Sequence, residues 1–138
     1  MKLELKHLAP YLPYGLKIEY FYDLVGKFGG YMESNLHNPI KVFYNGQDNR
    51  NLEAEMTNEI FMVFEDVKPI LRPLSDLTKD ELSIFSSSFR SWCLAKEFSF
   101  DFVWKNDLDL CFKYHIDVFG LIPAGLAVSI HDVGQVIA

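Results

Sequence analysis

The sequence has few cysteines and no long apolar run. Cys93 and Cys111 are the only two cysteines in 138 residues, so a disulfide framework is excluded, and their apolar neighbours predict reduced, buried thiols. The opening residues, MKLELKHLAPYL, lack the apolar core and the cleavage site of a signal peptide. No apolar run approaches the roughly 18–20 residues that cross a bilayer. These absences predict a cytoplasmic protein without membrane contacts.

A basic patch and cofactor motifs are also missing. The net charge is −6, divided evenly between residues 1–70 and 71–138, so neither half carries the electrostatic footprint of a nucleic-acid binder. The chain has no G-x-G-x-x-G, no Walker motif and no C-x-x-C pair. We therefore expect no cofactor and no metal, and we regard nucleic acid as an unlikely partner.

Apolar and aromatic residues are abundant. Apolar residues make up 49% of the chain, and aromatic residues make up 15%, including 12 Phe and 7 Tyr. A chain of this length buries enough surface to form one core without a disulfide or a bound metal, and large aromatic rings add much buried area. We expect a single domain, 1–138, with three parts: residues 1–66 mainly β, a Pro-rich crossing at 67–77, and residues 78–138 mainly helical.

The first half carries strand patterns. Alternating or β-branched apolar runs predict four strands, near 15–22, 28–36, 40–44 and 60–64. Residues 23–27, with Gly26, predict a turn, and Gly29–Gly30 indicates a bulge or a weakened strand. Asn45–Gly46 predicts a tight turn, so residues 45–51 form a hairpin loop. Residues 52–58 remain ambiguous.

The second half carries helix signals. Pro69 and Pro73 predict an extended linker rather than a helix. Thr78 and Glu81 form a T-x-x-E capping box, which starts a helix that we expect to run to about Ala95. Leu77 and Leu82 are placed for a hydrophobic staple. The expected buried stripe of this helix is Leu82, Phe85, Phe89, Trp92 and Cys93.

Residues 97–105 fit either a strand or the start of a helix. A second helix is expected from about Asn106, with Asn106 or Asp107 as its cap, to near Phe119. Gly120 is placed for the left-handed position at its end, and Pro123 prevents continuation. Residues 126–130 predict a return strand, and residues 131–138 a mobile end. The fold class is therefore α+β: an antiparallel sheet of about four strands, bent or closed into a partial barrel, with two C-terminal helices packed on it.

His115 and Asp117 are the first candidates for chemistry, because a histidine near a carboxylate can act as a general base or a metal ligand. On a helix, however, residues two apart point about 200° from each other. His115 also falls on the apolar stripe with Phe112 and Phe119, which favours a satisfied, half-buried histidine near a helix end.

His131, followed by Asp132, is the second candidate. Its spacing from His115 matches no zinc pattern, although a return strand beside the helix would let the two imidazoles approach. Three carboxylates near the second helix start are explained by capping and the helix dipole, and the serine run lacks a G-x-S-x-G context. These weaker candidates are Asp101, Asp107, Asp109 and Ser86–Ser88. We therefore assign no catalytic residue.

Three segments carry a family resemblance: LAPYLPYGLKI (8–18), VKPILRPLSDLTK (67–79) and HIDVFGLIPAGLAVSI (115–130). They resemble segments of small uncharacterised proteins encoded in prophages and mobile regions of gut-type bacteria. The chain departs from that pattern at Ile116, where the group has an aromatic residue. The resemblance implies a phage-related setting and no activity.

These observations favour a non-enzymatic accessory protein of phage or mobile-element origin that acts through contacts with a protein partner. One alternative is a small hydrolase or metal-dependent enzyme that uses His115 with nearby carboxylates or His131. The other is a nucleic-acid-associated phage protein, for which four basic residues would have to gather on one face. Those residues are Arg90, Lys96, Lys105 and Lys113.

Overall fold

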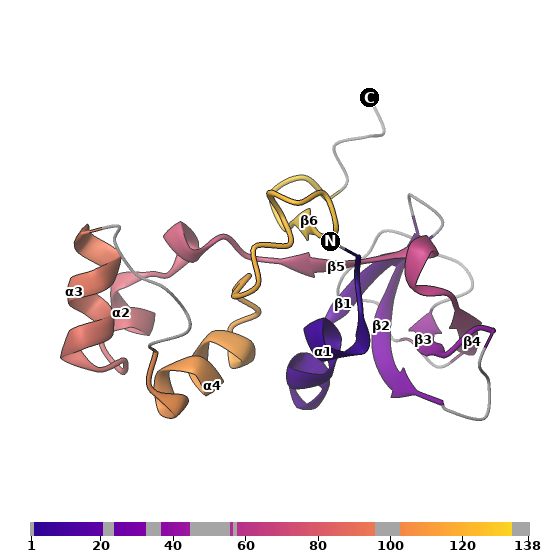
Figure 1. Ribbon diagram of the computed structural model, residues 1–138, viewed down its shortest axis with the longest axis horizontal. Coiled ribbons are helices and arrows are strands. Elements are labelled where there is room, and N and C mark those ends of the chain that lie inside the picture. The colour runs from indigo at the N-terminus through magenta and orange to yellow at the C-terminus, as the bar shows by residue number, and fades with distance from the viewer. Residues whose placement is uncertain are drawn as a thin grey trace.

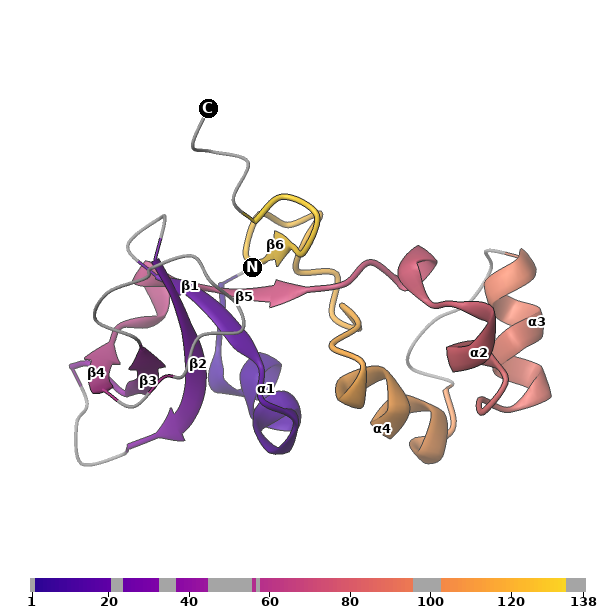
Figure 2. The same ribbon diagram turned by 180° about the vertical axis from the view of Figure 1, so that it is seen from behind.

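A computed structural model describes residues 2–20, 24–32, 37–44, 56, 58–95 and 103–133, with residues 94 and 95 described for the backbone alone. Its α-helices are α1 (Leu5–Leu8), α2 (Lys79–Leu82), α3 (Ser87–Ala95) and α4 (Lys105–Lys113). Both views place α2 and α3 at the end of the molecule farthest from the outer strands of the sheet, with α4 between that end and α1 (Figure 1, Figure 2).

The sheet has six strands in the order β4-β3-β2-β1-β5-β6. Neighbouring strands are antiparallel except for β5 and β6, which are parallel. The strands are β1 (Lys17–Tyr20), β2 (Leu24–Tyr31), β3 (Ile40–Tyr44), β4 (Asn58–Met62), β5 (Val67–Leu71) and β6 (Val128–Ser129).

The α+β class is confirmed, with two differences from the sequence prediction. The sheet is open rather than a partial barrel, and β5 is a strand beyond the four expected from the first half and the expected return strand. The helices that follow it also lie differently. A 3₁₀ helix, η1 (Ala9–Tyr14), packs against β2, and α4 packs against η1, whereas α2 and α3 extend beyond the end of the sheet (Figure 1).

The prediction of a Pro-rich linker is wrong for residues 67–71, which form strand β5 between β1 and β6, whereas residues 72–77 connect the sheet to α2. The N–H of Ile130 donates to the carbonyl of Leu71 at 2.9 Å, so the backbone polar groups of Leu71 face β6. Those of Pro69, two residues earlier, face the same side. The missing N–H of Pro69 therefore leaves the β1 ladder intact, and the β6 ladder begins only at Ile70.

The predicted turn at 23–27 is also wrong in its described part, because β2 already begins at Leu24. Gly26 lets β2 pack closely against β3, because a Cβ at this position would lie 2.6 Å from the carbonyl oxygen of Phe43. The alternative of a bulge at Gly29–Gly30 is confirmed, since the β2–β3 register shifts between Phe28 and Gly30.

The other strand predictions hold to within a few residues. Strand β1 lies inside the predicted 15–22, β3 matches residues 40–44, and β4 begins and ends two residues earlier than the predicted 60–64. A 3₁₀ turn, η2 (Phe64–Asp66), follows β4. The predicted loop 45–51, and residues 33–36 of the predicted second strand, lie outside the described residues.

One helix from Thr78 to Ala95 was expected, and the structure has two. The Thr78–Glu81 capping box is confirmed at the start of α2, which ends at Leu82. Ser86 then begins α3: its hydroxyl accepts from the N–H of Phe89 at 3.2 Å, as the side chain of an N-cap does. On the expected stripe, Phe85 and Phe89 are buried and stacked at 4.4 Å, whereas Leu82, Trp92 and Cys93 are half-buried.

Asp107 holds this second cap in place. It does not cap its own helix as expected, because α4 begins at Lys105 with Trp104 as its N-cap. Its carboxylate, on a residue only 3% exposed, accepts instead from the backbone N–H of Ser86 at 2.9 Å and from the Ser86 hydroxyl at 2.5 Å. The segment between α2 and α3 is thereby tied to the first turn of α4.

Asp107→Ala is expected to lower the free energy of unfolding by about 2 kcal/mol, because it removes the acceptor of two buried hydrogen bonds. Urea denaturation followed by circular dichroism measures this. Asp109→Ala, at an exposed position of the same helix, is the matched control and should change stability by less than about 0.5 kcal/mol. Equal effects of the two substitutions would contradict the role given to Asp107.

The C-terminal part returns to the sheet as predicted, since β6 lies within the expected residues 126–130. Residues 131–133 form a turn, while residues 134–138, and residues 97–102 of the ambiguous segment, lie outside the described residues. None of the helices in the described part of the chain is long and apolar enough to cross a membrane.

Candidate functional site

Helix α4 ends at Lys113, six residues before the expected end. The N–H of Ile116 donates to the carbonyl of Cys111 at 2.8 Å, and the N–H of His115 donates to that of Phe112 at 3.1 Å. These two bonds form a Schellman motif, in which the residue after the C-cap is left-handed. That residue is His115, with φ 59°, so the assignment of this position to Gly120 is wrong, although Gly120 is itself left-handed.

His115 joins η1 to the end of α4. Its Nε2 lies 2.7 Å from the carbonyl oxygen of Tyr14, so this nitrogen carries the proton and donates. Its own carbonyl accepts from the N–H of Arg72 at 2.8 Å. Burial lowers the pKa of the imidazole, and the bond to Tyr14 offsets this only in part. The expected satisfied, half-buried histidine near a helix end is confirmed.

Asp117 points into the turn that follows it. Its two carboxylate oxygens accept from the N–H groups of Leu121 at 2.8 Å and Ile122 at 2.9 Å. Its backbone N–H donates to the carbonyl of Arg72 at 3.0 Å. The carboxylate therefore stabilises a turn, and it does not share a hydrogen-bond partner with the His115 imidazole.

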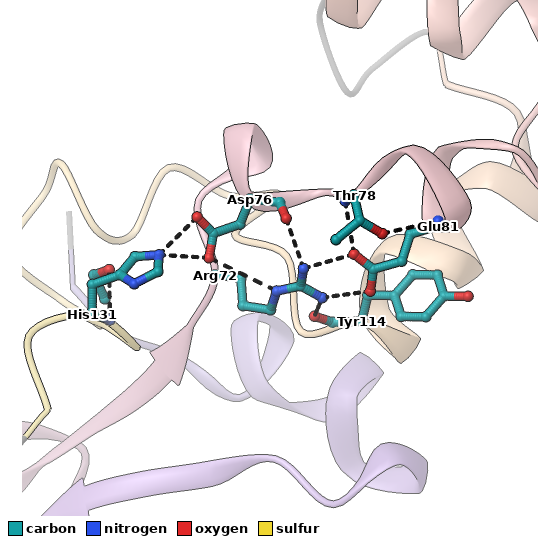
Figure 3. Close-up of polar contacts among 7 residues, drawn as sticks. Arg72, Asp76, Thr78, Glu81, Tyr114 and His131 are labelled. Atoms are coloured by element: carbon teal, nitrogen blue, oxygen red, sulfur yellow. Dashed lines mark hydrogen bonds and ion pairs between the residues drawn. The ribbon is translucent and has the colours of Figure 1, made fainter.

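Arg72 lies at the centre of a polar network that joins the sheet to α2 (Figure 3). Its guanidinium donates to both carboxylate oxygens of Glu81, at 2.9 and 2.8 Å, and to the backbone carbonyl of Asp76 at 2.9 Å. A longer contact of 3.4 Å reaches the carbonyl of Tyr114. The Arg72 side chain is 19% exposed, and that of Glu81 is 20% exposed. This geometry is a bidentate, half-buried ion pair.

His131 extends the network to the surface. Its Nε2 lies 2.7 Å from both carboxylate oxygens of Asp76, and Asp76 in turn lies 3.9 Å from Nε of Arg72 (Figure 3). The imidazole of His131 is 62% exposed. His131 thus binds Asp76 on the η3 turn (Leu74–Asp76), whereas His115 binds η1, so separate residues hold the two candidate histidines.

The structure gives no grouping that would hold a metal: across the described ranges, no three His, Cys, Asp or Glu side chains are suitably placed. Cys93 and Cys111 are free thiols. Burial raises the pKa of Cys111 to about 12 and also raises the pKa of Cys93, so neither is a ready nucleophile. Of the remaining weak candidates, Asp109 is exposed on α4 and Asp101 lies outside the described residues.

Three of the four basic residues considered for nucleic-acid binding are described, and they lie on two helices. Arg90 is on α3, and Lys105 and Lys113 are at opposite ends of α4. Lys113 lies over the ring of Tyr114, 5.9 Å from its centroid. Lys96 lies outside the described residues.

A pair of substitutions tests the backbone role of His115. His115→Gly and His115→Ala both lose the bond to Tyr14, but only glycine adopts a positive φ without strain, so the glycine variant should be more stable by about 1 kcal/mol. Thermal denaturation compares the two. At Asp109, an exposed residue in the middle of α4, the same pair should show the opposite order, because alanine favours a helix interior by about 1 kcal/mol. An alanine variant as stable as the glycine variant at 115 would contradict the Schellman assignment.

Sequence reasoning missed the network of Arg72, Asp76 and Glu81. The available signal was an arginine four residues before an aspartate, in a segment next to the capping box; Glu81 was identified only as a capping residue. The three segments singled out for their family resemblance meet here, through Tyr14, Arg72 and His115. Neither a protein-family model, nor a curated protein, nor a solved structure matches this chain.

Proposed function

We propose that the chain is a non-enzymatic accessory protein that works by binding another protein. The observation that carries this is the exposure of Trp104, whose residue surface is 67% accessible at the start of α4. Tryptophan is enriched in protein interfaces and dominates their binding energy, whereas exposed tryptophan is uncommon elsewhere.

A second exposed apolar side chain lies on a segment that is bonded to the first turn of α4. Ile84 is 54% exposed in the turn between α2 and α3. The bonds from Ser86 to Asp107 hold this turn against the first turn of α4, which Trp104 precedes. We call Trp104 and Ile84 the helical-end patch.

The polar groups of the candidate site support a structural role. His115, Asp117 and Arg72 are each engaged by backbone or ion-pair partners that join elements of the fold. The enzyme hypothesis stays a prediction that would now rest on His131, which is exposed, and its half-buried partner Asp76. The nucleic-acid hypothesis also stays a prediction. A phage or mobile-element setting and a cytoplasmic location complete the proposal, supported by the sequence resemblance and the two free cysteines.

The test compares proteins captured from a bacterial host lysate by the full chain and by Trp104→Ala and Ile84→Ala variants. A specific partner should be retained by the wild type and lost, or weakened at least about thirtyfold, with Trp104→Ala, as hot-spot truncations typically cost at least 2 kcal/mol. Tyr31→Ala is the control, because Tyr31 is also exposed, at 38%, but lies on β2. Capture that does not distinguish Trp104 from Tyr31 would refute the patch as the binding surface.

A further inference from the structure

A hollow of about 350 Å³ lies beside the sheet, away from the Arg72 network. The N-terminal segment, η2 and the start of β5 surround it, and Leu126 closes it from the C-terminal turn. Both views show the chain's first residues next to β5 and β6 (Figure 1, Figure 2). The volume of the hollow is at the lower end of the range for small-molecule pockets.

The walls of this hollow are apolar. Leu3 and Val67 are buried core residues, 6% and 2% exposed, and Phe64 and Leu126 are half-buried residues packed against the same core. An apolar ligand that removes the remaining surface of these side chains from water would gain roughly 25 cal/mol of binding free energy per Å².

The rim carries charged side chains of both signs, two lysines and two glutamates. Lys2 and Lys68 line the hollow, and no ion pair within the described part of the chain engages either ammonium group. Of the two rim carboxylates, Glu4 forms an ion pair with Lys6 at 3.3 Å. Glu65 has no ion-pair partner among the described residues. The two lysines, neither of which has an ion-pair partner among the described residues, are the groups that would hold an anion at the mouth.

We propose that this hollow is a binding site for a small amphipathic carboxylate, with its apolar tail against Leu3, Phe64, Val67 and Leu126 and its carboxylate between Lys2 and Lys68. This proposal is independent of the protein partner, because the helical-end patch lies on other elements. The tail supplies most of the affinity, and the ammonium groups select the charged head over a neutral one.

The experiment titrates octanoate into the ¹⁵N-labelled full chain and follows the amide shifts of Val67, Lys68 and Leu126 by NMR. We expect saturable shifts at these amides with a dissociation constant on the order of 1 mM, typical of ten ligand atoms in a half-open site. Octanol, which has the tail without the charge, and acetate, which has the charge without the tail, should each bind at least about threefold more weakly.

Lys68→Met should weaken octanoate binding by about twofold to fivefold and leave octanol binding unchanged, because it removes one exposed charge and keeps the length of the side chain. Lys79→Met, at an exposed lysine on α2, is the matched control and should change neither. Three results would overturn the proposal: no shifts at these amides up to about 10 mM octanoate, equal affinity for octanol, or shifts that centre on Trp104 and Ile84 instead.

Discussion

Arg72→Ala is expected to lower the free energy of unfolding by about 3 kcal/mol, which is a large share of the roughly 5–15 kcal/mol of a typical domain. The guanidinium makes two bonds to Glu81 and one to the carbonyl of Asp76, and its side chain is 19% exposed. Removing it leaves the half-buried Glu81 carboxylate without its cation, which costs more than losing an exposed pair. Equilibrium denaturation in urea measures the change.

Two further variants show that geometry rather than charge alone matters. Arg72→Lys keeps the charge but loses the bidentate fork, so its stability should lie between those of the wild type and the alanine variant. Arg90→Ala, at an exposed arginine on α3, should change stability by less than about 0.5 kcal/mol. If Arg72→Ala is no more costly than Arg90→Ala, the network is not a stabilising element.

The same ion pair predicts a dependence on pH. The hydrogen bonds from Arg72 are the main cause that lowers the pKa of Glu81 from 4.5 to about 2. A carboxyl group whose pKa is lower in the folded state stabilises the fold fully above its unfolded pKa, and this contribution is lost as the pH falls. Stability should therefore decline between about pH 4.5 and pH 2, and Glu81→Gln should flatten the profile in that window. An unchanged slope in the Glu81→Gln variant would contradict the assignment.

Local sequence signals predicted those parts of the fold that local chemistry determines. Thr78 and Glu81 form the expected capping box because both partners lie within one turn of the chain. The Gly29–Gly30 bulge and strand β3 follow from backbone preference and β-branched side chains in the same way. The failures arose where a distant element decides the outcome.

Pro69 and Ser86 show what local signals miss. A proline that would end a helix is accepted in β5 because its missing N–H faces away from β1, on the side where pairing with β6 begins only at Ile70. Ser86 fits a helix surface as well as an N-cap, and the choice is made by Asp107 on a different helix. Neither partner can be identified from spacing along the chain.

The candidate site was predicted only in part for the same reason. His115 was correctly expected to be satisfied and half-buried, but the left-handed position was assigned to Gly120, because glycine is the usual residue there. The bonds from His115 to Tyr14 and Arg72 fix the histidine in that conformation, and both partners lie far from it in sequence.

Tyr11→Ala should be the most damaging single change in the described part of the chain that we consider, with an expected loss of about 4 kcal/mol. Tyr11 is fully buried, and its ring meets that of Phe112 on α4 edge to face at 5.0 Å. Its hydroxyl donates to the carbonyl of Ile116 at 2.5 Å. Removing the ring therefore opens a cavity and leaves a buried carbonyl without its donor at the joint between η1 and the end of α4.

Tyr11→Phe separates these two effects and keeps the test usable if the alanine variant fails to fold. It retains the ring but removes the donor to Ile116, so it should lose about 1–2 kcal/mol. Tyr14→Phe in the same 3₁₀ helix is the matched control, because the Tyr14 ring is 38% exposed and its contact with His115 is made by the backbone carbonyl, which the substitution keeps. Calorimetric unfolding of the three variants should rank Tyr14→Phe, Tyr11→Phe and Tyr11→Ala in order of falling stability. If Tyr11→Phe matches Tyr14→Phe, the hydroxyl bond contributes nothing, and the joint between η1 and α4 depends on ring packing alone.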